Sequence, residues 1–150
     1  MKLSTRSRYG VRALCALALL AGKNGVVPLS RIAEQECISV RYLALIFHKL
    51  KKAGLVETER GPNGGFRLAK NPGELTVGEV VRAMDGSLAP VGCLKSPGKD
   101  PASRCPRKAV CLSRPAWVVL ERQIEAALDS ITIASLVEGR VREGGAYLGR

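Results

Sequence analysis

Residues 38–70, ISVRYLALIFHKLKKAGLVETERGPNGGFRLAK, decide the fold. In the first half of this stretch, apolar residues recur every three or four positions, a spacing that places them on one face of a helix. The pattern predicts a helix over residues 40–53, which Gly54 ends. Its buried face is expected to consist of Leu43, Ile46, Phe47 and Leu50.

The second half of the stretch predicts a β-hairpin. Residues 55–58 and 66–68 alternate like strands. The segment 61–65 between them, Gly-Pro-Asn-Gly-Gly, is typical of a turn. Arg60 and Arg67 flank the tip of this hairpin.

Two further helices are predicted upstream. Apolar residues between Tyr9 and Gly22 have helical spacing, and Ser30 is expected to cap a second helix. A short turn at residues 37–39 joins this second helix to the helix of residues 40–53. Two helices with a brief turn between them, the second rich in basic residues, are typical of a helix-turn-helix, and the hairpin after them is a wing.

Downstream, Thr76 and Glu79 have the spacing of a capping box for a fourth helix. Residues 86–112 lose all periodicity and contain three cysteines. A long helix begins at Ser113, and an apolar stripe along it is suited to packing against a second helix, or against its own domain. The stripe consists of Trp117, Leu120, Ile124, Ala127 and Ile131.

The positive charge is concentrated in the first half of the chain. Of 150 residues with a net charge of +11, residues 1–70 hold 13 Lys and Arg against 4 Asp and Glu, or +9. Such a field attracts a polyanion, although a solvated surface would carry the same charge. An enzyme is disfavoured, because the glycines of segment 61–65 precede a strand and so do not form a phosphate-binding loop.

The basic and then apolar N-terminus resembles a signal peptide, but its apolar run also has the spacing of an amphipathic helix. Five cysteines, an odd number, favour a reducing compartment. No segment approaches the roughly 20 apolar residues that span a bilayer. We therefore expect a soluble, cytoplasmic protein without membrane contact.

DNA contacts are expected from the start of the recognition helix, because its N-terminal residues face base edges. Arg41 is the best candidate for a guanine contact, and Ser39 and Tyr42 lie beside it. Arg60 at the wing can reach the minor groove. Arg8, with its basic neighbours in the first helix, can meet the phosphate backbone.

Cys93, Cys105 and Cys111 lie in one Gly- and Pro-rich segment with the spacing C-x11-C-x5-C. Three thiolates fall one short of the four ligands that an iron–sulfur cluster usually takes, so the fourth ligand is unknown. Zinc and a thiol–disulfide sensor remain alternatives. Cys15 and Cys37, in or beside apolar helical sequence, are expected to be small core residues.

The chain resembles the Rrf-two family of winged-helix regulators, which includes a regulator of iron–sulfur cluster assembly and a nitric-oxide sensor. The matching segments are MKLSTRSRYGVRAL, the stretch quoted first, LTVGEVVRAMDG, the cysteine segment and ITIASLVE. The resemblance implies a homodimer formed through residues 113–130 and a palindromic operator in double-stranded DNA. It implies DNA contacts from the recognition-helix start and from the wing, and a cluster held by the three cysteines. The implied contact residues are Ser39, Arg41, Tyr42, Arg60, Gly61 and Pro62.

The chain also departs from that family. Arg114 stands where some members have a histidine ligand, and Arg8 stands where others have an acidic one. A two-iron two-sulfur cluster is weakly favoured over a four-iron four-sulfur cluster. Ala44 and Leu45 occupy recognition-helix positions that are often polar in the family, so a different operator sequence is expected.

The predicted fold is mainly α: a winged helix-turn-helix domain with a β-hairpin wing, plus a long C-terminal dimerisation helix. Residues 1–85 are expected to bind DNA, 86–112 to hold the cluster, 113–138 to dimerise and end in a short helix, and 139–150 to form a flexible tail. The predicted function is transcriptional regulation, with operator affinity modulated by a cluster that senses redox state, nitric oxide or cluster and iron supply. The alternative is the same dimer regulated by thiol–disulfide switching or a bound partner protein.

Overall fold

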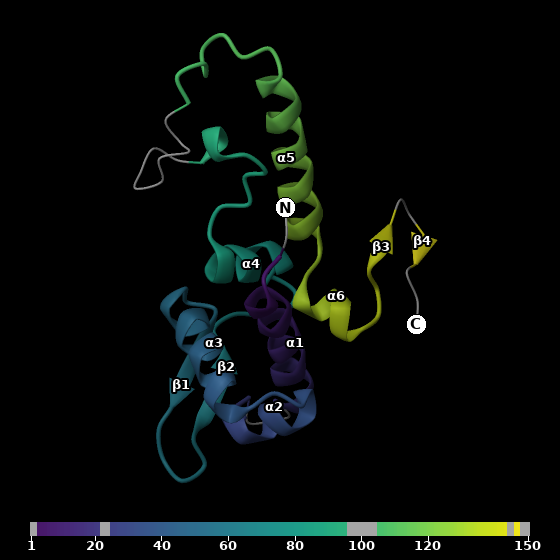
Figure 1. The fold of residues 1–150 in the computed structure, drawn as a ribbon. Coiled ribbons are helices and arrows are strands. Elements are labelled where there is room, and N and C mark those ends of the chain that lie inside the picture. Colours follow the sequence, from purple (N-terminus) through teal and green to yellow (C-terminus); the bar gives the residue numbers. More distant parts are fainter. Residues whose placement is uncertain (1–2, 22–24, 96–104, 144–145, 148–150) are drawn as a thin grey trace.

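The computed structural model describes residues 3–21, 25–95, 105–143 and 146–147. A helix-rich winged-helix part lies below in Figure 1, and one long helix, α5, rises from it. The helices are α1 (Thr5–Leu20), α2 (Leu29–Glu36), α3 (Val40–Lys52), α4 (Val77–Asp85), η1 (Gly92–Leu94, a 3-10 turn), α5 (Arg114–Ser130) and α6 (Ile133–Val137). The strands are β1 (Val56–Glu59), β2 (Gly65–Leu68), β3 (Arg142–Glu143) and β4 (Ala146–Tyr147). The mainly helical fold with a hairpin wing is as predicted.

The helix-turn-helix consists of α2 and α3. The Ser39 side chain accepts a hydrogen bond of 3.3 Å from the Tyr42 amide and so caps α3. The predicted Ser30 cap of α2 is wrong, because Pro28 precedes the helix and Ser30 lies within its first turn. Cys37 ends α2 in the left-handed conformation, with φ of 53°, and its amide bonds the last carbonyls of that helix. It is exposed, so the prediction of a core residue there is also wrong.

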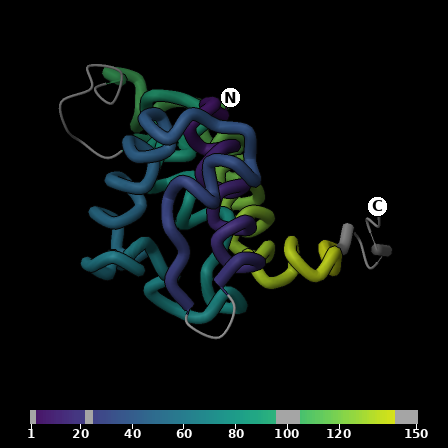
Figure 2. Tube along the Cα trace, turned by 90° about the horizontal axis from the view of Figure 1, so that it is seen from below, coloured from purple at the N-terminus to yellow at the C-terminus, as the bar shows by residue number. Residues whose placement is uncertain are grey.

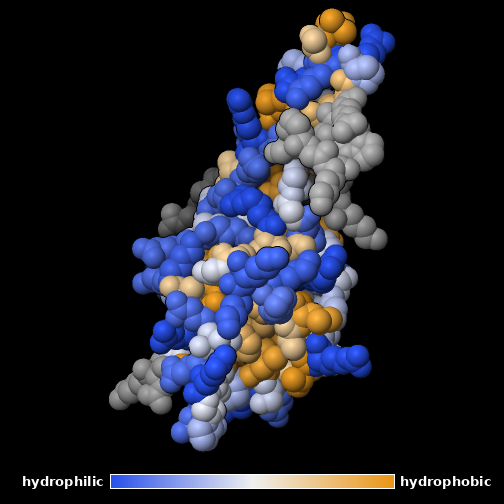
Figure 3. Space-filling model, turned by 90° about the vertical axis from the view of Figure 1, so that its left-hand side faces the viewer, coloured by the Kyte–Doolittle hydropathy of each residue, from blue (hydrophilic) through white to orange (hydrophobic). Residues whose placement is uncertain are grey.

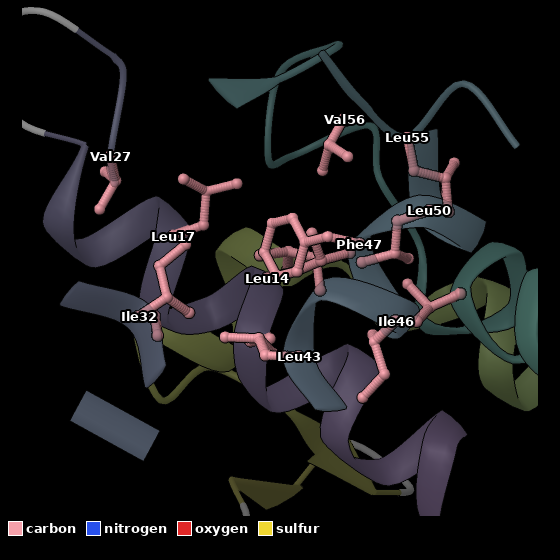
Figure 4. Close-up of a cluster of buried hydrophobic side chains, with 14 of the residues drawn as sticks. Leu14, Leu17, Val27, Ile32, Leu43, Ile46, Phe47, Leu50, Leu55 and Val56 are labelled. Carbon is pink, nitrogen blue, oxygen red and sulfur yellow. The ribbon is translucent and has the colours of Figure 1, made fainter. Parts of the chain in front are cut away.

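The core is built around Phe47 of α3. Figure 4 shows Leu14 and Leu17 of α1 and Ile32 of α2 gathered near this ring. The ring of Phe66 from the wing lies edge-on to Phe47, with the ring centroids 4.6 Å apart. The predicted inner face of α3 is confirmed, since its four members are at most 1% exposed: Leu43, Ile46, Phe47 and Leu50.

The wing is anchored to the connection between α1 and α2. Strands β1 and β2 are antiparallel, with Glu59 opposite Gly65 nearest the turn. Val27 and Phe66 exchange backbone hydrogen bonds of 2.8 and 2.9 Å, so the wing is fixed on both sides of β2. At Gly65 a Cβ atom would lie 2.3 Å from the Val27 carbonyl oxygen, which explains why glycine stands there.

Replacing Gly65 with Ala is expected to open the Val27–Phe66 bridge and to lower the free energy of unfolding by about 1–3 kcal/mol, the usual cost of overpacking. Urea unfolding of both proteins measures the difference. Gly73→Ala is the matched control, because the nearest atom to its Cβ would be the end of the Asn71 side chain at 3.3 Å. Equal losses in the two variants would contradict this explanation of the wing anchor.

Helix α4 joins the winged-helix part to α5. The predicted capping box is present: the Glu79 amide donates to the Thr76 hydroxyl at 3.2 Å, and the Thr76 amide donates to the Glu79 carboxylate at 2.9 Å. Arg82 of α4 pairs with Asp129 of α5, Nη2 to Oδ1 at 2.6 Å. The Val77 amide donates to the Ile131 carbonyl at 2.8 Å. These contacts fix the lower end of α5 against α4.

Replacing Asp129 with Asn tests this junction by its pH dependence. The hydrogen bond from Arg82 holds the pKa of Asp129 below its ordinary 3.8, so the pair stabilises the fold fully above about pH 5 and loses its effect as pH falls through the folded-state pKa. Both side chains are more than a third exposed, so the expected loss at pH 7 is only about 0.5–1 kcal/mol. Urea unfolding should show a difference between variant and wild type at pH 7 that becomes smaller as the pH is lowered below 3.8. A difference that does not depend on pH would contradict the assignment.

No residue of α5 is buried. Trp117 and Leu120 of the predicted apolar stripe are 38% and 42% exposed, and Val119 on another side is 57% exposed. Beyond α5 the chain runs to one side through α6 (Figure 2). Within the predicted tail of residues 139–150, β3 pairs with β4, Arg142 opposite Tyr147. Within the described ranges, every helix is too short or too polar to cross a membrane.

Candidate functional site

The start of α3 presents the predicted DNA-contacting residues together. Ser39 precedes the helix, and Arg41 lies in its first turn with an exposed side chain. Among the described residues, the Arg41 guanidinium has no hydrogen-bond or ion-pair partner. Tyr42 packs instead against Tyr9 of α1, edge to face with the ring centroids 6.0 Å apart. Arg41 is therefore the free cation of this turn, and Tyr42 is half-buried between two helices.

The wing presents one free arginine and one paired arginine. Arg60 is exposed at the end of β1, and no described residue forms an ion pair with it. Arg67 pairs with Glu57 at 2.7 Å, and this hydrogen bond raises the pKa of its guanidinium. Gly61 has φ of 122°, a conformation that favours glycine, and exposed Pro62 follows it. The positive charge available at the wing tip is therefore that of Arg60.

The first helix contributes less free charge than the sequence indicates. Arg8 is exposed and donates a hydrogen bond of 3.2 Å to the Thr5 hydroxyl beside it. Arg12 is held by the end of α2, with its Nε 2.7 Å from the Glu36 carboxylate and its Nη2 2.8 Å from the Glu36 carbonyl. Arg12 thus fixes α1 to α2, and no contact joins Arg8 to Arg41 within the described part of the chain.

Two lysines of α3 have structural contacts that sequence reasoning missed. The Lys51 ammonium donates to the Thr58 hydroxyl of β1 at 2.6 Å, and the Lys49 ammonium donates to the Met84 carbonyl of α4 at 3.3 Å. These lysines help to hold the wing and α4 against α3. On the molecular face seen in Figure 3, hydrophilic side chains dominate the winged-helix part, but an apolar area interrupts them.

The three cysteines of the irregular segment precede α5 in the chain. Cys93 belongs to η1, and Cys105 and Cys111 bound a series of turns that leads into α5. All three are half-exposed free thiols, and residues 96–104 between the first two lie outside the described residues. Among the residues that are described, no three metal-ligating side chains come together. The structure therefore places Cys105 and Cys111 in one segment but does not assemble a ligand set.

Cys111 has the chemistry of a ligand or a reactive thiol. Its sulfur lies 3.3 Å from the Ser113 hydroxyl, and hydrogen bonds from Ser113, helped by the Arg114 amide and the charge of Arg107, lower the pKa of the thiol. The thiolate is the form that binds metal and attacks disulfides. Cys15 is the opposite case, since burial, with the nearby charge of Glu36, raises its pKa to about 11. Cys15 therefore stays protonated and inert.

Arg114 adds a second observation at this end of α5. Its Nε is buried and has no hydrogen-bond partner among the described residues. Its backbone amide donates to the Cys111 carbonyl at 3.3 Å, so Arg114 belongs to the same turn as the cysteine. A buried donor without an acceptor is costly.

Comparisons with known proteins give one consistent result. A family model described as "Rrf2: Iron-dependent Transcriptional regulator" matches residues 3–139. The transcriptional regulator IscR of Aliivibrio salmonicida is 40% identical over 137 residues, which are 91% of this chain and 77% of that protein. The solved structure of T. potens IscR is similar with a TM-score of 0.69 and 33% identity, covering 96% of this chain and 94% of the other. The structure of CymR, described as the global cysteine regulator of B. subtilis, is similar with a TM-score of 0.71 and 30% identity, covering 92% and 97%.

Proposed function

Because the chain belongs to the Rrf2 family of transcriptional regulators, we propose that it binds a palindromic operator as a homodimer whose affinity depends on an iron–sulfur cluster. The observation that carries the DNA-binding part is the pair of unpaired arginines, Arg41 on α3 and Arg60 on the wing. Arg12 and Arg67, in contrast, are held by carboxylates. The relatives are regulators and not enzymes.

In this proposal α3 enters the major groove and the wing approaches the adjacent minor groove. Arg41 has the forked donors that match the two acceptors of a guanine edge, and Ser39 offers a hydroxyl beside it. Arg60 reaches the minor groove, with the backbone of Gly61 and Pro62 close to the phosphates. Arg8 contributes a backbone contact from α1.

The dimer is proposed to form through the apolar stripe of α5. A helix of 17 residues without one buried side chain, but with Trp117 and Leu120 exposed on one face, has apolar surface that a second copy would cover. The contacts of Asp129 with Arg82 and Thr76 fix the base of α5 to α4. Pairing of two α5 helices would therefore also fix the distance between the two α3 helices.

The cluster is proposed to be held by Cys93, Cys105 and Cys111. The position of the half-exposed Cys111 thiol, 3.3 Å from the Ser113 hydroxyl, and the lowered pKa that results support a thiolate ligand there. A bound cluster supplies iron that reacts with oxidants and nitric oxide, and its presence also reports the supply of iron. The turns from Cys105 to Ser113 lead directly into α5, so the conformation of this segment affects the helix that we propose to form the dimer.

A second candidate keeps the DNA-binding dimer and regulates it by thiol chemistry. The observation that favours it is that Cys111 is a half-exposed free thiol 3.3 Å from the Ser113 hydroxyl, a contact that lowers its pKa and so promotes oxidation. The two candidates differ in a measurable product. Mild oxidation followed by mass spectrometry would yield a Cys105–Cys111 disulfide for a thiol switch, whereas anaerobically purified protein would contain iron for a cluster regulator.

A genome-wide binding profile of the full chain in its own cells tests the proposed function. We expect a limited number of discrete sites that share a palindrome, with the half-site centres about one helical turn of DNA, or a multiple of it, apart. In vitro, log affinity for such a site should fall linearly as log salt rises. A profile without enriched sites, or a binding signal that depends only on the amount of DNA and not on its sequence, would contradict the proposal.

A further inference from the structure

The outer face of α3 carries apolar side chains that the protein core does not use. The core is filled from the opposite face of this helix, where Leu43 and Phe47 are fully buried. On the outer face, Leu45 is 62% exposed, Val40 is 49% exposed, and Ala44 is exposed as well. Together these side chains form an apolar surface on one face of α3 that another molecule can cover.

These apolar residues share a face with Arg41. Residues three and four positions apart lie on the same side of a helix, so Ala44 and Leu45 follow Arg41 by one turn. His48 continues this face and is also exposed. A recognition helix turns the residues of its first turns toward the base edges. Ala44 and Leu45 therefore occupy base-facing positions if α3 enters the major groove.

The surroundings of this apolar face are positively charged. Arg41 lies on it, Lys52 lies at the C-terminal end of α3, and Arg60 lies on the wing, all with exposed side chains. No carboxylate pairs with these three groups in the part of the chain that the structure describes. A polyanion complements this charge. Among polyanions, duplex DNA displays one apolar group in its major groove, the 5-methyl group of thymine.

We propose that Ala44 and Leu45 contact thymine methyl groups in each operator half-site, next to the guanine that Arg41 contacts. The inference rests on the proposed function, because it places α3 in the major groove. Neither Ala44 nor Leu45 has a side-chain hydrogen-bond donor or acceptor, so these residues can distinguish bases only by shape and by contact with a methyl group. They lie roughly 4.5–6 Å beyond Arg41 along the helix axis, which is about one to two base-pair steps.

Deoxyuridine tests this inference, because it pairs as thymidine does but lacks the 5-methyl group. An operator is first selected from a random DNA library with the purified full chain, and each dT of its half-sites is then replaced by dU. Fluorescence anisotropy at fixed salt should give a Kd about three- to tenfold higher at one or two positions per half-site. Those positions should lie one or two base pairs from a conserved guanine.

Replacing Leu45 with Ala tests whether the Leu45 side chain causes the loss of affinity for dU. At one of the sensitive positions, the Leu45→Ala protein should bind the operator with dT and the operator with dU with equal Kd. Its thermal unfolding should match that of the wild type, because Leu45 is exposed. Lys52→Ala is the control: it should weaken binding to both operators and keep their ratio unchanged.

The outcomes separate this inference from the proposed function. If the library yields no enriched sequence, the proposed function fails and this inference fails with it. If a palindrome is selected but dU is tolerated at every position, only the thymine contact is overturned. Full sensitivity to dU in Leu45→Ala would likewise overturn the assignment to that residue.

Discussion

Replacing Leu120 with Glu is expected to separate the dimer and to raise the Kd for a palindromic operator by about 100-fold or more. Leu120 lies on the apolar stripe of α5 and is 42% exposed in the single chain, beside Trp117 at 38%. A charge placed there would be buried without a partner if two α5 helices packed together. The operator affinity falls because two half-sites no longer bind one linked pair of α3 helices.

Sedimentation velocity measures the oligomeric state, and fluorescence anisotropy measures the operator affinity. Ala126→Glu is the matched control, because it adds the same charge to an exposed position of α5 that lies about 120° around the helix from Leu120. We expect Ala126→Glu to remain a dimer. A Leu120→Glu protein that stays dimeric would remove α5 from the interface and contradict the proposed geometry.

Replacing Cys105 or Cys111 with Ala is expected to abolish cluster binding almost completely. With three protein thiolates for a group that usually takes four ligands, each loss leaves at most two. Anaerobically purified wild type should be coloured and contain iron and acid-labile sulfide, whereas either variant should be colourless. Cys111→Ala also removes the thiol whose pKa the hydrogen bonds from Ser113 lower.

Cys37→Ala is the control for these variants. Cys37 is an exposed thiol that ends α2, far along the chain from the proposed ligands, so its loss should leave the iron content unchanged. Equal iron content in Cys105→Ala and the wild type would contradict the assignment. A colourless wild type from cells competent in cluster assembly would remove the cluster from the proposed function and favour the thiol switch.

Apolar periodicity predicted the parts of the fold that depend on one buried face. The inner face of α3 and the capping box of Thr76 and Glu79 follow from residues that are neighbours in sequence. The errors have local causes. Pro28 takes the position before α2 because its fixed φ suits a helix start, and Cys37 adopts a left-handed conformation that ends α2 and exposes its side chain. The pairing of β3 with β4 had no apolar alternation to reveal it.

The candidate site was less predictable, because charges acquire their roles through tertiary contacts. Arg12 and Glu36 are 24 residues apart, and only the crossing of α1 and α2 brings them together. The sequence therefore does not distinguish this structural arginine from the free Arg41. Likewise, the spacing of three cysteines does not tell whether they converge. In the sequence, Arg114 is notable only because some family members have a histidine ligand at its position. Its buried Nε becomes visible only in the structure.

Regulation by the cluster is tested by the operator affinity of one protein preparation, measured anaerobically with and without its cluster at a single salt concentration. We expect the two Kd values to differ by about 5- to 150-fold, the usual range of coupling between two binding sites. We also expect Cys105→Ala to have the Kd of the cluster-free protein under both conditions. Equal Kd values for the loaded and cluster-free protein would contradict regulation by the cluster, even if the operator were bound tightly.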